Sequence, residues 1–153
     1  MTDQYQAFTQ SPLGKFVVKN LGLPSPVSLD RFENAQPVVN GAVLLGAAPS
    51  STISASIAQI LSNIHADSYV GNNVELQQTA AKVGLNLRPL NADDKESKFK
   101  AVVFDASGIQ NSEQLNELYK FFNPIARQVA TSGRVIVIGT TPETAKTVKQ
   151  AIA

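Results

Sequence analysis

The sequence predicts an α/β fold in which a doubly wound parallel sheet forms the middle of three layers, with a helical extension before it. Short and almost purely apolar runs occur at 42–46, 101–105 and 134–139, as in strands buried on both faces. Segments whose apolar residues recur at helical spacing lie between them. Alternating strands and helices build a parallel sheet with right-handed crossovers and helices on both faces.

Residues 1–41 are expected to form a helical extension and an irregular lead-in, and residues 42–153 the α/β domain. Ser11 followed by Pro12 is typical of a helix start with proline at its first position. The apolar positions that follow fit one helical face: Leu13, Phe16, Val17 and Leu21. Gly22 suits a left-handed cap that ends this helix.

The first half of the α/β domain opens with the strand at 42–46. A helical stripe follows it, made of Ile53, Ile57, Ile60, Leu61 and Ile64. Residues 67–70 are expected to form a weak second strand, 74–83 a helix capped by Gly84, and 85–90 a third strand.

The second half opens with the strand at 101–105. Asn111 and Gln114 have the spacing of a helix start that side chains cap reciprocally. We expect this helix to continue across Pro124, with a kink, to Val129 and to end at Gly133. The strand at 134–139 follows, and Pro142 opens a final helix whose inward residues are Ala145, Val148 and Ile152.

Composition excludes several classes of function. Thirteen basic and 12 acidic residues leave a net charge of +1, which gives no field to attract nucleic acid or an anionic membrane. The chain has no cysteine and a single histidine, so thiolate and multi-histidine metal sites are excluded and a reducing, cytoplasmic location fits. The stretch between Glu33 and Asp67 has no charge, but polar residues and prolines interrupt it, which favours a buried strand and helix over a membrane span.

The candidate binding residues follow the first strand, where an open parallel sheet holds its ligands. A dinucleotide site needs a G-x-G-x-x-G pattern there, and only Gly46 fits it. The hydroxyls of Ser50, Ser51 and Thr52 remain candidates for a lone phosphate, as in a flavin mononucleotide loop. Plain capping of the next helix is the favoured alternative, because serine is a common N-cap residue.

Two other residues have positions that suggest chemistry. Asp105 ends a strand, as a phosphoacceptor aspartate does, but an acidic pair is missing after the first strand, and capping of the turn at 105–108 is favoured. His65 comes near a helix end, where an imidazolium complements the helix dipole. It has no serine or aspartate placed beside it in sequence, so a structural or exposed role is expected.

Three separated blocks resemble the N-terminal domain of high-molecular-weight 3-oxoacyl-acyl-carrier-protein reductases, members of the short-chain dehydrogenase/reductase family. The first block is Ser-Pro-Leu-Gly at 11–14 with Leu-Gly-Leu-Pro-Ser-Pro at 21–26. The second is Val-Phe-Asp-Ala-Ser-Gly-Ile at 103–109, and the third covers 121–124 and 132–143.

The resemblance implies a flavodoxin-like or degenerate Rossmann-like domain that precedes a reductase domain of the same chain. The parent enzyme is then expected to reduce 3-oxoacyl thioesters with NADH or NADPH in fatty-acid metabolism, and a homodimer is left open. The catalytic serine is absent from the matching strand end at 139–142, and the tyrosine–lysine pair is absent from 144–153. No catalytic residue, metal site or cofactor is therefore expected in this chain itself. The alternative is a stand-alone domain that binds a nucleotide or flavin phosphate.

Overall fold

The computed structural model describes residues 8–9, 11–22, 33–91 and 94–151. The chain divides into two compact units, Met1–Phe32 and Glu33–Ala153, and each is treated by itself. The expected lead-in at 24–41 lies partly outside the described residues.

The first unit contains helix α2 (Pro12–Leu21), whose two ends are as expected. The Ser11 hydroxyl oxygen accepts a hydrogen bond from the Gly14 N–H at 3.0 Å, and Pro12 occupies the first turn. Gly22 has φ 64°, and its N–H donates to the Val18 carbonyl. The side chains of Leu13, Phe16 and Leu21 are exposed.

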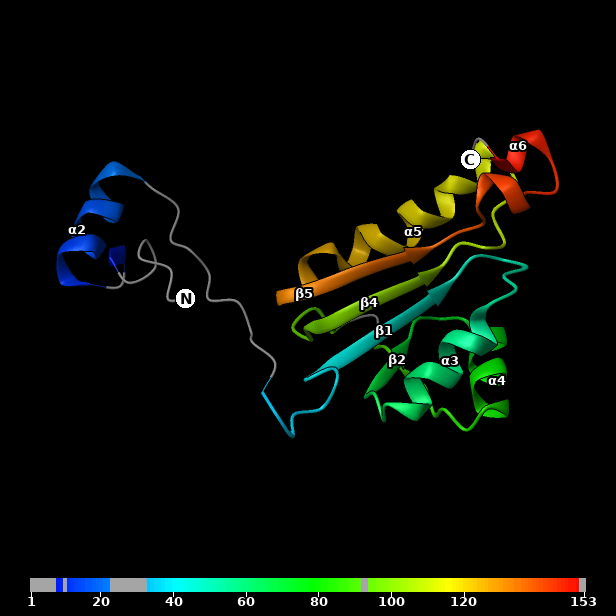
Figure 1. The fold of residues 1–153 in the computed structure, drawn as a ribbon, viewed down its shortest axis with the longest axis horizontal. Helices are drawn as coiled ribbons and strands as arrows, with labels where there is room; N and C mark the ends of the chain where they lie inside the picture. The colour runs from blue at the N-terminus through cyan, green and yellow to red at the C-terminus, as the bar shows by residue number, and fades with distance from the viewer. Residues whose placement is uncertain (1–7, 10, 23–32, 92–93, 152–153) are drawn as a thin grey trace. The chain divides into compact units, whose positions relative to one another are not determined.

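The second unit is built on a sheet of five parallel strands, which confirms the fold class (Figure 1). The strands are β1 (Ala42–Ala47), β2 (Ser68–Val70), β3 (Arg88–Pro89), β4 (Phe99–Asp105) and β5 (Val129–Ile138). Their order is β3-β2-β1-β4-β5. Of the two expected topologies, this is the Rossmann-type order, which reverses between strands 1 and 4.

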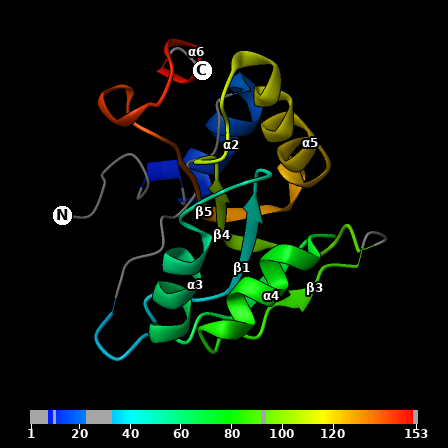
Figure 2. The same cartoon turned by 90° about the vertical axis from the view of Figure 1, so that its right-hand side faces the viewer.

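Helices cover both faces of this sheet (Figure 2). The helices α3 (Ser54–Asn63) and α4 (Val74–Lys82) lie on one face, and α5 (Asn116–Ile125) lies on the other. Two core clusters confirm the layering. The cluster on the α3 and α4 side includes Val43, Leu45, Ile57, Leu61, Val70 and Leu76. Sheet residues that point to the α5 side include Leu44, Phe99 and Val102.

The helix expected through Val129 ends earlier, and this part of the prediction is wrong. Helix α5 ends at Ile125, a short 3-10 turn covers Ala126–Gln128, and β5 already begins at Val129. The pairing with β4 shifts from Phe99↔Val129 to Ala101↔Arg134. The turn-like residues 130–133 therefore form an irregularity inside the strand, and Gly133 lies within β5 instead of ending a helix.

Two other elements are shorter than the sequence predicts. The third strand keeps only Arg88–Pro89. After β5, a 3-10 turn (Pro142–Thr144) and the short helix α6 (Val148–Ala151) replace one continuous helix. Val148 is 79% exposed, so the expectation that it points inward is wrong, and Ile152 lies outside the described residues.

Candidate functional site

The carboxyl ends of β1 and β4 lie side by side at the point where the strand order reverses. Ala47 pairs with Asp105 in the parallel register. The first loop, residues 48–53, follows β1, and the second loop, residues 106–111, follows β4. This position is the usual ligand site of a doubly wound sheet, so its polar groups decide what the domain can bind.

The Asp105 carboxylate is fully buried and accepts three hydrogen bonds. Its Oδ2 accepts from the Ser54 hydroxyl at 2.6 Å. Its Oδ1 accepts from the Ser107 hydroxyl at 2.6 Å and from the Ser107 N–H at 3.0 Å. The bonds to Ser107 confirm that Asp105 caps its own turn. A buried carboxylate with these partners is not presented to solvent as a phosphoacceptor would be.

Two of the three hydroxyls of the first loop bind the end of β4 and the second loop, and they do not cap a helix. The Ser51 hydroxyl donates to the Asp105 carbonyl at 2.8 Å. The Thr52 N–H donates to the Ser107 hydroxyl oxygen at 2.9 Å, and the Thr52 hydroxyl lies 3.2 Å from the same atom. The N-cap of α3 is Ile53, with no side-chain hydrogen bond, so the predicted serine capping is wrong.

Two glycines allow close packing here, Gly108 between the two loops and Gly46 between β1 and α5. A Cβ atom at Gly108 would lie 2.1 Å from the Pro49 carbonyl oxygen and 2.7 Å from the Ser51 nitrogen. A Cβ atom at Gly46 would lie 2.3 Å from a ring carbon of Phe121. The space beside the glycine expected to admit a phosphate is therefore filled by an aromatic ring of the protein.

A cavity of about 440 Å³ remains beside the closed loops. The candidate residues Gly46, Ser50, Ser51 and Thr52 all line it. Ser50 is exposed and has φ 61°, whereas Ser51 and Thr52 already hold the contacts described above. The structure thus brings the candidate residues together, but two of the three hydroxyls are engaged within the protein.

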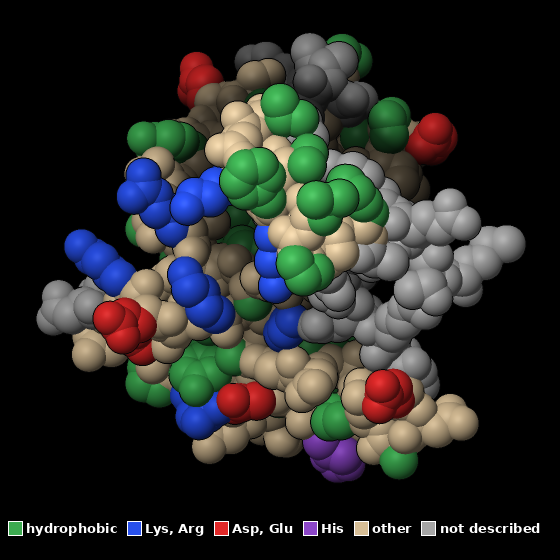
Figure 3. Space-filling model, turned by 90° about the vertical axis from the view of Figure 1, so that its left-hand side faces the viewer, with side chains coloured by type: hydrophobic (Ala, Val, Ile, Leu, Met, Phe, Trp, Pro, Cys, Tyr) green, Lys and Arg blue, Asp and Glu red, His purple; other side chains and the backbone are tan. Residues whose placement is uncertain are grey.

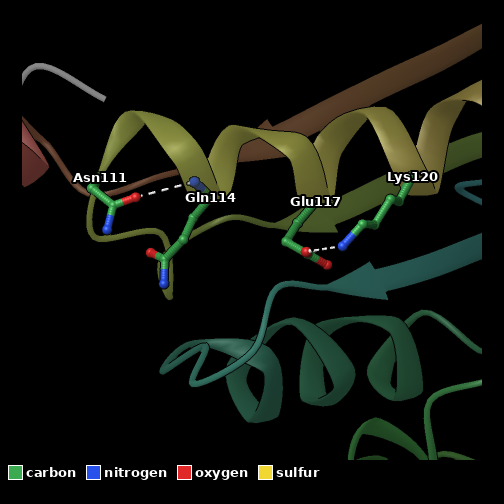
Figure 4. A network of polar contacts seen from close by, with 4 residues as sticks. All are labelled: Asn111, Gln114, Glu117 and Lys120. Atoms are coloured by element: carbon green, nitrogen blue, oxygen red, sulfur yellow. Dashed lines mark hydrogen bonds and ion pairs between the residues drawn. The ribbon is translucent and has the colours of Figure 1, made fainter.

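Charged side chains on this cavity give it an excess of one negative charge. The Lys120 ammonium donates to the Glu117 carboxylate at 2.7 Å, and Glu75 adds a second carboxylate. Figure 4 shows Glu117 and Lys120 pointing from α5 toward the first loop. Since the one lysine is already paired, the cavity offers no free cation for a phosphate among its described lining residues.

The start of α5 shows how the sequence places these charges. The Asn111 side-chain oxygen accepts from the Gln114 N–H at 3.1 Å, as Figure 4 shows. Reciprocal capping would have the Gln114 side chain accept from the Asn111 N–H. It accepts instead from the N–H of the preceding residue, Gln110, at 2.6 Å. The spacing therefore located the start of the 3-10 turn that leads into α5.

Sequence reasoning missed the residues that α4 and its lead-in add to the cavity. Asn72 follows β2, and Asn73 caps α4 by accepting from the Leu76 N–H at 2.9 Å. Both line the cavity, as does Glu75. The Gly-Asn-Asn sequence after β2 was the available signal, because asparagine before an apolar helical pattern is typical of a helix start.

The remaining expectations concern His65, metals and membranes. His65 is exposed and has φ 53°, and Figure 3 shows the histidine in purple at the surface. Within the described ranges, no three acidic or histidine residues form a group suited to a metal ion. No helix in the described part of the chain combines the length and apolar character needed to cross a membrane.

Comparison with known proteins adds no neighbour. Neither a scan against protein-family models nor a search of curated protein sequences matches this chain.

Proposed function

We propose that this chain is a non-catalytic accessory domain at the N-terminus of a 3-oxoacyl-acyl-carrier-protein reductase. Two features support the proposal: the three sequence blocks that resemble this family, and the polar groups at the carboxyl ends of β1 and β4 that bind one another. The parent enzyme reduces 3-oxoacyl thioesters with NADH or NADPH in the cytoplasm, and the reductase domain of the same chain is the partner.

One observation carries the non-catalytic part of the proposal. The Asp105 carbonyl accepts from the Ser51 hydroxyl, and the Ser107 hydroxyl oxygen accepts from the Thr52 N–H, so groups of the first loop that a dinucleotide would use are already bound. The Phe121 ring also fills the space beside Gly46, and Ala48 stands where the dinucleotide pattern needs the glycine that lets a pyrophosphate approach the backbone. These residues do not fit a nicotinamide dinucleotide, which supports a Rossmann-type domain that serves another domain's reaction.

The coding sequence beyond Ala153 tests the proposed parent. We expect a T-G-x-x-x-G-x-G loop after a strand, followed by a serine and a Tyr-x-x-x-Lys pair, because the dinucleotide and the proton donor must then come from the second domain. A continuation without this pattern, or a stop codon directly after Ala153, would overturn the proposal.

A second candidate function rests on the cavity of about 440 Å³. A stand-alone domain of this kind would bind a nucleotide or flavin phosphate at Ser50 and the neighbouring strand ends. Thermal shift measurements with flavin mononucleotide, NADH and NADPH separate the two candidates, because a ligand that binds only the folded chain raises its melting temperature. The accessory role predicts no shift with any of the three, and a clear shift with one of them would favour the binding domain.

A further inference from the structure

The two edges of the sheet differ in how they resist pairing with another strand. The edge strand β3 consists of Arg88 and Pro89 alone. Proline has no N–H to donate, and short charged strands are a common protection against edge pairing. The opposite edge strand, β5, covers ten residues, Val129–Ile138, and pairs only with β4 in the described part of the chain.

Three consecutive apolar side chains of β5 are exposed, and we call Val135, Ile136 and Val137 the β5 edge. They are 52%, 45% and 48% exposed, respectively. Their register partners on β4, Val102, Val103 and Phe104, are at most 6% exposed. The side chains therefore change from buried on β4 to about half exposed on the neighbouring strand β5.

The register also shows that both faces of the sheet are open at β5. Laterally paired residues of a parallel sheet point to the same face, so Ile136 points with Val103 toward the side of α3 and α4. Val135 points with Val102 toward the side of α5. Parallel sheets are normally covered on both faces, and an exposed apolar edge is a template for another strand.

The topology of the unit indicates what completes this edge. The Rossmann order continues with a sixth parallel strand beside strand 5. A crossover to such a strand starts at the carboxyl end of β5 and returns to its amino end. The 3-10 turn Pro142–Thr144 and α6 follow β5 at its carboxyl end, where such a crossover would begin, as Figure 1 shows.

We infer that the β5 edge is paired with a sixth, parallel and apolar strand supplied by the polypeptide of the parent enzyme that follows this chain. The inference rests on the proposed function, since it needs that continuation. The uncharged run Val135–Ile138 favours an apolar strand as the partner. The β5 edge is then the place where this domain is joined to the rest of the enzyme.

Thiol labelling of an Ile136→Cys variant tests this occupant, because the chain contains no cysteine of its own. The variant is made in the 153-residue chain and in the full-length parent, and the labelled peptide is followed by mass spectrometry. We expect rapid labelling in the chain and labelling at least about tenfold slower in the parent, where local opening must precede reaction. The matched control is Val74→Cys, at a position that is 60% exposed on α4 and should label at similar rates in both.

The outcomes separate the possible occupants. Equal labelling of the Ile136→Cys thiol in the chain and in the parent would overturn the inference, as would equal slowing at the two labelled positions. In the 153-residue chain, protection of this thiol could instead increase with protein concentration. That result would show that a second copy of the chain covers the β5 edge, and it would also overturn the inference. A continuation that protects the same thiol but lacks the reductase motifs would overturn the proposed function alone, and a stop codon after Ala153 would overturn both.

Discussion

Two regions of one sheet differ in how far their side chains are satisfied within the chain. The first is the carboxyl ends of β1 and β4, and the second is the β5 edge. At the first, a buried carboxylate, serine hydroxyls and a threonine bind one another, and Phe121 fills the space beside Gly46. At the second, three apolar side chains are about half exposed. Most polar groups at the usual ligand position of the fold are thus bound within the protein, whereas a position usually covered by another element is open. This difference favours a domain that serves as a structural partner.

Removal of the buried carboxylate should have the largest effect. Asp105→Ala deprives the Ser54 and Ser107 side chains of their acceptor, and we expect it to lower the free energy of unfolding by about 4 kcal/mol. Urea denaturation measures the change. The control Asp67→Ala removes an exposed ion pair with Arg88 and should change the free energy by less than about 1 kcal/mol. Similar effects of the two variants would mean that the Asp105 bonds do not hold the two loops together.

A second pair of variants compares burial on adjacent strands directly. Val102 and Val135 are register partners on the same face, but Val102 is fully buried and Val135 is 52% exposed. We expect Val102→Ala to lower the free energy of unfolding by about 2.5 kcal/mol and Val135→Ala by less than about 1 kcal/mol. Denaturation curves of the 153-residue chain supply both values. A large cost at Val135 would show that β5 is already covered in this chain.

Gly46→Ala tests the contact between β1 and the Phe121 ring. The new methyl group must displace the Phe121 ring, so we expect a loss of about 1.5 kcal/mol in the free energy of unfolding. Gly71→Ala is the control, because a Cβ atom there meets nothing within 4 Å. Thermal melts of both variants, and of Gly46→Ala combined with Phe121→Leu, give the comparison. Failure of the second substitution to recover stability would contradict the proposed contact.

The smallest effect concerns Asp94, a half-buried counterpart of Asp105. The Ser97 hydroxyl, and then the Ser97 N–H, holds the pKa of Asp94 below its ordinary value of 3.8. Because the pKa is lower in the folded chain, ionised Asp94 stabilises that chain above pH 3.8, and this contribution is lost as the pH falls through the folded pKa. Ser97→Ala should raise the pKa of Asp94 toward 3.8 in an NMR titration. An unchanged titration curve would assign the low pKa to other groups.

Local sequence signals predicted most of the elements. Ser11, Pro12 and Gly22 mark both ends of α2, and apolar runs located β1 and β4. The early start of β5 was missed because Ser132 and Gly133 have the composition of a turn. The tertiary pairing of Val129 with Phe99 brings these residues into the strand as an irregularity.

The candidate site was only partly predictable for a related reason. The strand-end rule singled out Gly46, Ser51 and Thr52, and the structure places all three on the cavity. The partner of Thr52 is 55 residues away in sequence, so no local pattern could show that Ser107 binds the Thr52 N–H. The contact of Phe121 with Gly46 likewise depends on how α5 lies on the sheet.

The most direct test of the accessory role is an assay of acetoacetyl thioester reduction, followed by the oxidation of NADH and NADPH. The purified 153-residue chain and the full-length parent are assayed side by side at equal molar concentration. We predict turnover by the parent and none by the chain, with either nucleotide. Measurable turnover by the chain alone would contradict it.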